Sequence, residues 1–184
     1  MKKSRLLLPA VLACVALAAS AVPLKTDVAR SSVAAVFKQM NVPVEAKFKK
    51  FSAQVDYDAA RPENGKAIVD IDTASLDLGD AEMNKEVAKK DWFNAAQYPK
   101  ATFTSSSIKP NGAGKLTVAG KLAIKGKTLD VSFPLTVKAE GGKQVFEGTL
   151  PIKRLAFNIG EGEWKDTSMV ADDVVIKFRV TAAQ

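Results

Sequence analysis

One short motif brings together the residue types of a phosphate-binding loop: Gly120, followed by Gly126-Lys127-Thr128. Such a loop has four residues between its glycines and opens a helix, because backbone N–H groups hold the phosphate. Here five residues separate the glycines, and Leu122 and Ile124 alternate with polar residues as in a strand. The sequence therefore predicts a turn between two strands around residues 125–127.

A group of acidic residues could bind a hard cation, because carboxylates at alternate positions can surround calcium. An EF-hand loop starting at Asp70 needs an oxygen ligand, a glycine and a glutamate where the chain has Ala74, Ser75 and Ala81. We interpret these acids as solvated strand ends and a helix cap, and we predict no metal site. The group consists of Asp70, Asp72, Asp77 and Asp80.

The first 21 residues resemble a secretory signal. Lys2, Lys3 and Arg5 precede an apolar run, which ends in the small-x-small pattern Ala19-Ser20-Ala21. We expect cleavage before Val22 and delivery to the periplasm. The residues before Cys14 loosely resemble a lipoprotein-processing site, which is the less favoured alternative.

The chain has no histidine, and its one cysteine lies in the expected signal. The mature protein would then lack a thiol nucleophile, a Ser-His-Asp triad, a disulfide, and a zinc or haem site built on imidazole or thiolate ligands. Neighbouring acids such as Asp172 and Asp173 occur by chance in a chain with 20 acidic residues. We therefore expect neither an enzyme nor a cofactor.

The charge of the chain is modestly positive. The formal net charge is +7, and removing the three basic residues of the expected signal leaves 24 − 20 = +4. Nucleic-acid binders usually concentrate basic residues on one face, whereas here they are spread along the chain. We therefore expect no nucleic-acid partner.

Most of the chain alternates apolar and polar residues with a period of two, which is typical of strands with one buried face. The clearest run extends from Leu129 to Val137, and the last from Val174 to Val180. The pattern predicts about eight strands. The six weaker runs cover residues 31–40, 46–57, 66–76, 101–108, 115–124 and 144–152.

Eight antiparallel strands with one buried face can close into a barrel whose interior holds a small ligand. A two-sheet sandwich fits the same alternation equally well.

One helix is expected, from about Asp80 to Phe93. Asp80 is a candidate N-cap, and Met83, Val87, Ala88 and Trp92 recur at helical spacing. Pro99 then disfavours helical geometry at the residue before it, so the segment DWFNAAQYPKATF should turn from helix into strand. We expect the helix to pack across one mouth of the barrel.

Several blocks along the chain resemble the YceI-like family of lipocalin-like, polyisoprenoid-binding proteins. They include FKKFSAQVDYD from Phe48, VDIDTASLDLGD from Val69 and DWFNAAQYPKATF from Asp91. Gly120 to Thr128 resembles the family's Gly-x-Leu-x-Ile-x-Gly-x-Thr hairpin, and GEGEW from Gly160 resembles its closing block. The resemblance favours a mainly β fold: an eight-stranded antiparallel lipocalin-like barrel with one short helix, over residues 22–184.

The resemblance implies that the barrel holds a polyisoprenoid, an isoprenoid quinone or another fatty chain, and that the protein is a carrier or sequestering protein and often a homodimer. Arg154 is the candidate to meet a polar or anionic head group, with Trp92 at the helix end of the channel. The other candidate residues of the channel wall are Phe37, Met40, Phe93, Phe103, Leu122, Phe133 and Phe157.

Two departures from the family pattern concern the head group. Many relatives carry a histidine before the first Ser-Ser and an Arg-Asp pair at the helix, where this chain has Arg30 and Met83-Asn84. Two alternatives to lipid binding stay open: an enzyme acting on an isoprenoid, and an adaptor with a solid core.

Overall fold

The computed structural model describes residues 22–184, most of which lie in strands or short helical segments. The expected signal and Cys14 lie outside the described residues. Short 3-10 turns are η1 (Val28–Arg30), η2 (Pro62–Asn64), η3 (Thr73–Ser75), η4 (Arg154–Phe157) and η5 (Gly162–Lys165). The strands are β1 (Val22–Thr26), β2 (Ser32–Gln39), β3 (Val42–Phe48), β4 (Phe51–Tyr57), β5 (Lys66–Asp72), β6 (Leu76–Asp77), β7 (Lys100–Pro110), β8 (Lys115–Ile124), β9 (Lys127–Glu140), β10 (Lys143–Lys153) and β11 (Val170–Ala183).

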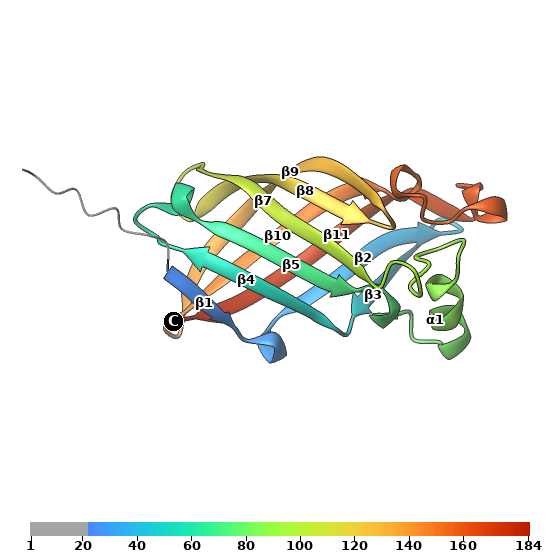
Figure 1. Ribbon diagram of the computed structural model, residues 1–184, viewed down its shortest axis with the longest axis horizontal. Coiled ribbons are helices and arrows are strands. Elements are labelled where there is room, and N and C mark those ends of the chain that lie inside the picture. The colour runs from blue at the N-terminus through green and yellow to red at the C-terminus, as the bar shows by residue number, and fades with distance from the viewer. Residues whose placement is uncertain (1–21) are drawn as a thin grey trace, which may run out of the picture.

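An eight-stranded antiparallel ring forms the barrel, in the order β1-β4-β5-β7-β8-β9-β10-β11. The short strand β1 closes it, because Leu24 pairs with Val55 of β4 while Lys25 pairs with Ala183 of β11. Figure 1 shows the long strands crossing the barrel obliquely along its longest dimension. The barrel predicted by the family resemblance is confirmed, and the alternative of a two-sheet sandwich is wrong.

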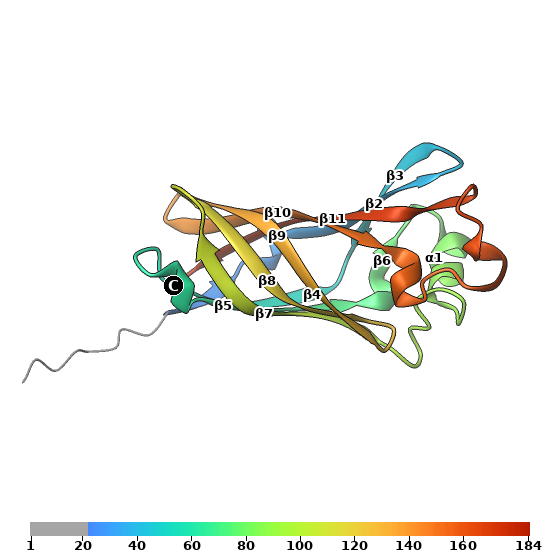
Figure 2. The same ribbon diagram turned by 90° about the horizontal axis from the view of Figure 1, so that it is seen from above.

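The membership of the ring differs from the prediction. The run at residues 31–40 is β2, which pairs with β11 and continues through β3 to β6 outside the ring. In the ring its place is taken by β1, which follows the expected cleavage point and was not predicted as a strand. Figure 2 shows the β2–β3 hairpin standing away from the barrel near α1.

Two predicted strands are each interrupted. The run at 46–57 bends at Lys49 and Lys50, which separate β3 from β4, and the run at 66–76 is broken by η3 between β5 and β6. The bend and η3 bond to each other, since the Lys50 N–H donates to the Ser75 hydroxyl over 3.1 Å. Both interruptions lie where the sheet leaves the closed ring.

The helix α1 (Ala81–Ala88) is shorter than predicted. Asp80 caps it as expected, because its carboxylate accepts from the N–H groups of Glu82 and Met83. The helix stops at Lys89, whose backbone is extended, and residues 89–98 form turns instead. Extending it to Phe93 was wrong, because the chain turns there to bring Trp92 and Phe93 against the barrel interior.

The segment that resembles a phosphate-binding loop forms the hairpin between β8 and β9. Ile124 pairs with Lys127, and the two turn residues Lys125 and Gly126 both have positive φ angles, 46° and 76°. That geometry is typical of a tight two-residue hairpin. The predicted turn between strands is confirmed.

Candidate functional site

An elongated channel of about 310 Å³ runs inside the barrel. Its walls are almost entirely aliphatic and aromatic, since each long strand turns every second residue inward. Lining residues extend from Met83 on α1 to Tyr57 near η2, so the channel follows the long axis of the molecule. The hollow interior contradicts the solid core expected of the adaptor alternative.

Aromatic rings form the middle of the wall. Phe133 packs edge-on against Phe103 and Phe178, with ring centroids 5.4 and 5.5 Å apart. Gly120 permits the close approach of Phe103, because a Cβ there would lie 2.7 Å from that ring. Edge-to-face contacts of this kind stabilise the wall, and they leave the channel that the rings surround open.

Most of the predicted wall residues do line the channel. The structure brings together Phe37, Trp92, Phe93, Phe103, Leu122, Phe133 and Arg154 around this one cavity.

Two predicted wall residues do not line it. Met40 lies in the turn between β2 and β3 with a positive φ angle of 47° and is 61% exposed. Phe157 is only 1% exposed, but it lies on η4 and packs into the core behind the wall. Both assignments were wrong, because strand alternation was extended through a turn and through a helical turn.

The Arg154 side chain is buried, and all its N–H groups donate to the protein backbone. Nε donates to the carbonyl of Ala171, Nη1 to those of Ile159 and Gly160, and Nη2 to those of Trp164 and Val170. A guanidinium has five N–H donors, so none is left for a head group. The predicted contact between Arg154 and a head group is therefore wrong, although the residue borders the channel.

Arg154 instead fastens the loops at the α1 end to the barrel. Its partners belong to the loop between η4 and η5, to η5 and to the start of β11, and its guanidinium lies 5.7 Å from the centroid of the Trp92 ring. Burial lowers the pKa of Arg154, an effect that Asp172 opposes. Gly160 (φ +80°) is required beside it, because a Cβ there would lie 2.0 Å from Nη1.

The α1 end of the channel holds partly exposed polar groups. Gln39 ends the inward-facing row of β2, and Met83 and Glu86 face the channel from α1. The Glu86 carboxylate accepts a hydrogen bond from Lys89 over 2.6 Å. Met83 is 48% exposed, so the channel reaches the surface here.

The opposite end, near η2, is closed in by aromatic and aliphatic residues. Tyr57 packs edge-on against Phe146 at 5.2 Å between ring centroids. Burial raises the pKa of the Tyr57 phenol, with a further contribution from Asp58. This end therefore presents a phenol that stays protonated at neutral pH.

Trp92 lies where the channel meets the loops of the α1 end. Its ring is 5.3 Å from that of Trp164, and both tryptophans of the chain line the channel. Within residues 22–184 the buried Trp92 Nε1–H has no hydrogen-bond partner. Such a donor is rare in folded proteins and is destabilising.

Comparison with known proteins identifies the fold. The YceI-like domain family matches residues 24–182, nearly the whole of the described chain. The chain belongs to the YceI-like family. Its sequence is 35% identical to a UPF0312 protein of Ectopseudomonas mendocina over 118 residues, which cover 61% of this chain and 62% of that protein. Several Pseudomonas putida relatives match over about half of their length.

The solved structures that resemble this YceI-like chain include the following two. Burkholderia cenocepacia BcnA is 58% identical and superposes with a TM-score of 0.84, covering 86% of this chain and 100% of that one. A polyisoprenoid binding domain from Saccharophagus degradans is 17% identical, with a TM-score of 0.70 over 89% of this chain and 98% of that domain. At this low identity the second likeness shows the fold alone.

The two departures from the YceI-like pattern lie in different places. Arg30 is on η1, is exposed, and pairs with Asp27 at 3.7 Å rather than lining the channel. Asn84 is structural: its amide oxygen accepts from the Leu78 N–H over 2.7 Å, and its amide nitrogen donates to Asp77 over 3.0 Å. Of the departing residues, only Met83 borders the channel.

Several polar and aromatic residues of the YceI-like channel were not predicted as site residues, among them Gln39, Tyr57 and Trp164. Gln39 could have been found, because it continues the alternation Val33, Ala35, Phe37 by one step. Tyr57 could have been found in the same way from the alternation of β4. Trp164 could not, because η5 brings it to the channel without any strand pattern.

Two other features are absent from the part of the chain that the structure describes. Residues 22–184 contain no group of three or more His, Cys, Asp or Glu side chains placed to hold a metal ion. No helix in that range is long and apolar enough to cross a membrane.

Proposed function

We propose that this protein binds a polyisoprenoid, an isoprenoid quinone or another long-chain lipid inside its barrel, as a periplasmic carrier or sequestering protein. The observation that carries the proposal is the apolar channel of about 310 Å³ along the barrel axis. Pockets of this size and character are typical of small-molecule binding sites. A polar ligand would find few hydrogen-bonding partners on these walls.

Burial of the chain supplies the binding energy in this proposal. Each methylene transferred from water to an apolar site contributes about 0.8 kcal/mol. About ten buried methylenes would thus contribute about 8 kcal/mol, against which the cost of ordering the chain must be set. A flexible isoprenoid can follow the wall around Phe103, Phe133 and Phe178, since van der Waals contact requires no fixed register.

Binding is favoured over catalysis by the groups that face the channel. An acid–base enzyme needs an ionisable group that is free to exchange a proton near neutral pH. The guanidinium of Arg154 is fully engaged, Glu86 pairs with Lys89, and the raised pKa of Tyr57 keeps its phenol protonated. The Saccharophagus degradans relative of the same fold is described as a polyisoprenoid binding domain, which supports the same class of ligand.

Secretion and assembly complete the proposal. The signal-like residues 1–21 support a periplasmic location, where a lipid must be shielded from water between membranes. A homodimer is proposed from the family resemblance, and light scattering of the purified protein tests it.

Mass spectrometry of an organic extract from protein purified from its own host tests the proposed function. We expect one long-chain lipid class in amounts close to one per chain. As a control, Arg179→Met on the outer surface of β11 should retain the same lipid. Absence of lipid from the extract, together with no binding of added isoprenoids, would contradict the proposed function.

A further inference from the structure

We propose that the channel selects lipids whose head group is uncharged, and that the side-chain amide of Gln39 binds this head group at the α1 end. The inference rests on the proposed function and specifies its ligand class. It follows from which polar groups face the channel and which of them are already engaged.

Gln39 is a polar residue at the α1 end of the channel whose side chain is free to bind a ligand. It is the last residue of β2 and lies on the inner face with Phe37, opposite Val170 of β11. It is half-buried, and within the described residues no hydrogen bond to its side chain is found. An amide offers donors and an acceptor together, so it can bind an alcohol or a carbonyl equally well.

The charges around the channel exclude an anionic head. Asp56, Glu86 and Arg154 are the charged residues that line it within residues 22–184. Arg154 has no donor left, and Glu86 would repel an anion. A phosphate or carboxylate bound there would lose part of its hydration without meeting a free counter-charge, which is unfavourable.

Neither Asp56 nor the nearby Lys89 changes this conclusion. Lys89, beside the mouth, is held by the Glu86 carboxylate at 2.6 Å. Asp56 lies at the η2 end between Val55 and Tyr57, both of which line the channel, so strand alternation directs its carboxylate outward.

Tyr57 is the rival site for an uncharged head. Its phenol faces the η2 end, but its ring is packed against Phe146, and a phenol donates only one hydrogen bond. Gln39 is preferred because it lies where the exposed Met83 shows that the channel reaches the surface. A head group there keeps part of its hydration while the chain is buried.

Titration with two ligands of the same chain, geranylgeraniol and geranylgeranyl monophosphate, tests the charge selection. Both tryptophans line the channel, so intrinsic fluorescence reports binding. We expect the alcohol to bind at least about tenfold more tightly than the phosphate. Equal affinity, or a preference for the phosphate, would overturn the charge selection, whereas binding of neither ligand would count against the proposed function itself.

Substitutions of Gln39 test the position of the head group. Gln39→Leu should lower the affinity for the alcohol about fivefold. Gln39→Lys should raise the affinity for the phosphate about tenfold, because it supplies the missing counter-charge. Gln54→Leu and Gln54→Lys, on the outer face of β4, should change neither affinity. Weakening of the alcohol by Tyr57→Phe but not by Gln39→Leu would place the head group at the η2 end and overturn this assignment.

Discussion

The two ends of the barrel are built by different kinds of interaction. At the η2 end the backbone itself closes the ring, because β1 pairs with β4 on one side and β11 on the other. At the α1 end the sheet leaves the ring through β2, β3 and β6, and side chains hold the loops together. Strand ladders thus give the barrel its shape, while a few polar side chains position the mouth of the channel.

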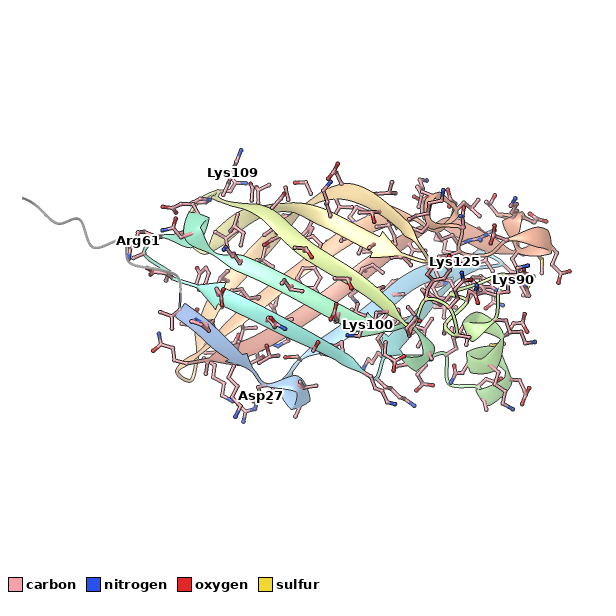
Figure 3. All side chains as sticks on the ribbon, in the orientation of Figure 1. Asp27, Arg61, Lys90, Lys100, Lys109 and Lys125 are labelled. Atoms are coloured by element: carbon pink, nitrogen blue, oxygen red, sulfur yellow. The ribbon has the colours of Figure 1, made fainter. Side chains whose placement is uncertain are left out.

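The polar connections at the α1 end come in three groups. Arg154 donates to five backbone carbonyls. Lys125, in the β8–β9 turn, donates to the Asn158 carbonyl over 2.6 Å and to Glu161 over 2.8 Å. Asp77 joins Lys49 of the β3–β4 bend to Asn84 of α1. Figure 3 labels Lys90 and Lys125 at this end of the molecule and Arg61 and Lys109 at the other.

The largest effect is expected from Arg154→Met. It leaves several buried carbonyls without a donor, so the free energy of unfolding should fall by about 4 kcal/mol. Urea unfolding followed by circular dichroism measures this. Arg179→Met provides the matched control, because Arg179 is partly exposed and forms ion pairs on the outer surface. This substitution should lower the free energy of unfolding by at most about 1 kcal/mol. Similar losses for the two arginines would remove the distinction between the ends.

Phe157→Ala and Phe133→Ala compare the packed core with the channel wall. Phe157 is 1% exposed and does not border the channel, so its truncation should cost about 3 kcal/mol or more of unfolding free energy. Phe133 faces the channel on one side and loses fewer contacts, so we expect a smaller loss, about 2 kcal/mol. Denaturant titration of both variants decides the order. A larger loss for Phe133→Ala would mean that its side of the wall is packed rather than hollow.

A pH-dependent effect is expected from Asp77. Hydrogen bonds from Lys49, Asn84 and the Gly79 N–H lower its pKa from 3.8 to about 2. Because the pKa is lower in the folded state, this carboxylate stabilises the fold above pH 3.8, and the contribution is lost as the pH falls toward 2. The Tm of Asp77→Asn should therefore lie below that of the unchanged protein at pH 6, and the two should converge near pH 2. A constant difference across this range would contradict the assignment.

The smallest effect is expected from Trp92→Phe. The substitution removes the buried N–H that has no partner in the described chain, while keeping a ring beside Trp164 and Arg154. The stability gained by removing this unpaired donor should offset the packing lost with the smaller ring, so the free energy of unfolding should change by less than about 1 kcal/mol. Trp164→Phe serves as the comparison. A loss of several kcal/mol would indicate that the Trp92 N–H has a partner in solution.

The difference between the ends also explains what the sequence could predict. Alternation identified the eight long runs and placed Phe103, Leu122 and Phe133 on the inner face, because a strand fixes the direction of every side chain. It failed at Met40 and Phe157, where the chain turns. The engagement of Arg154 depends on carbonyls from residues 159–171, whose positions no local pattern specifies.

The closing strand was missed for a related reason. β1 has only five residues, and of these Leu24 alone packs against the core cluster. Its position is fixed by hydrogen bonds to β4 and β11, which are distant in sequence. Short strands held by their neighbours leave little signal in the sequence.

The central claim is that the interior of the barrel is a channel that a lipid chain occupies. Val69→Phe and Ile68→Phe test it most directly, because the two positions are adjacent on β5 while only Val69 lines the channel. Titration with geranylgeraniol, followed by tryptophan fluorescence, should show binding lost or weakened by about tenfold or more in Val69→Phe and unchanged in Ile68→Phe. Equal binding by both variants, with both folded by circular dichroism, would contradict the claim.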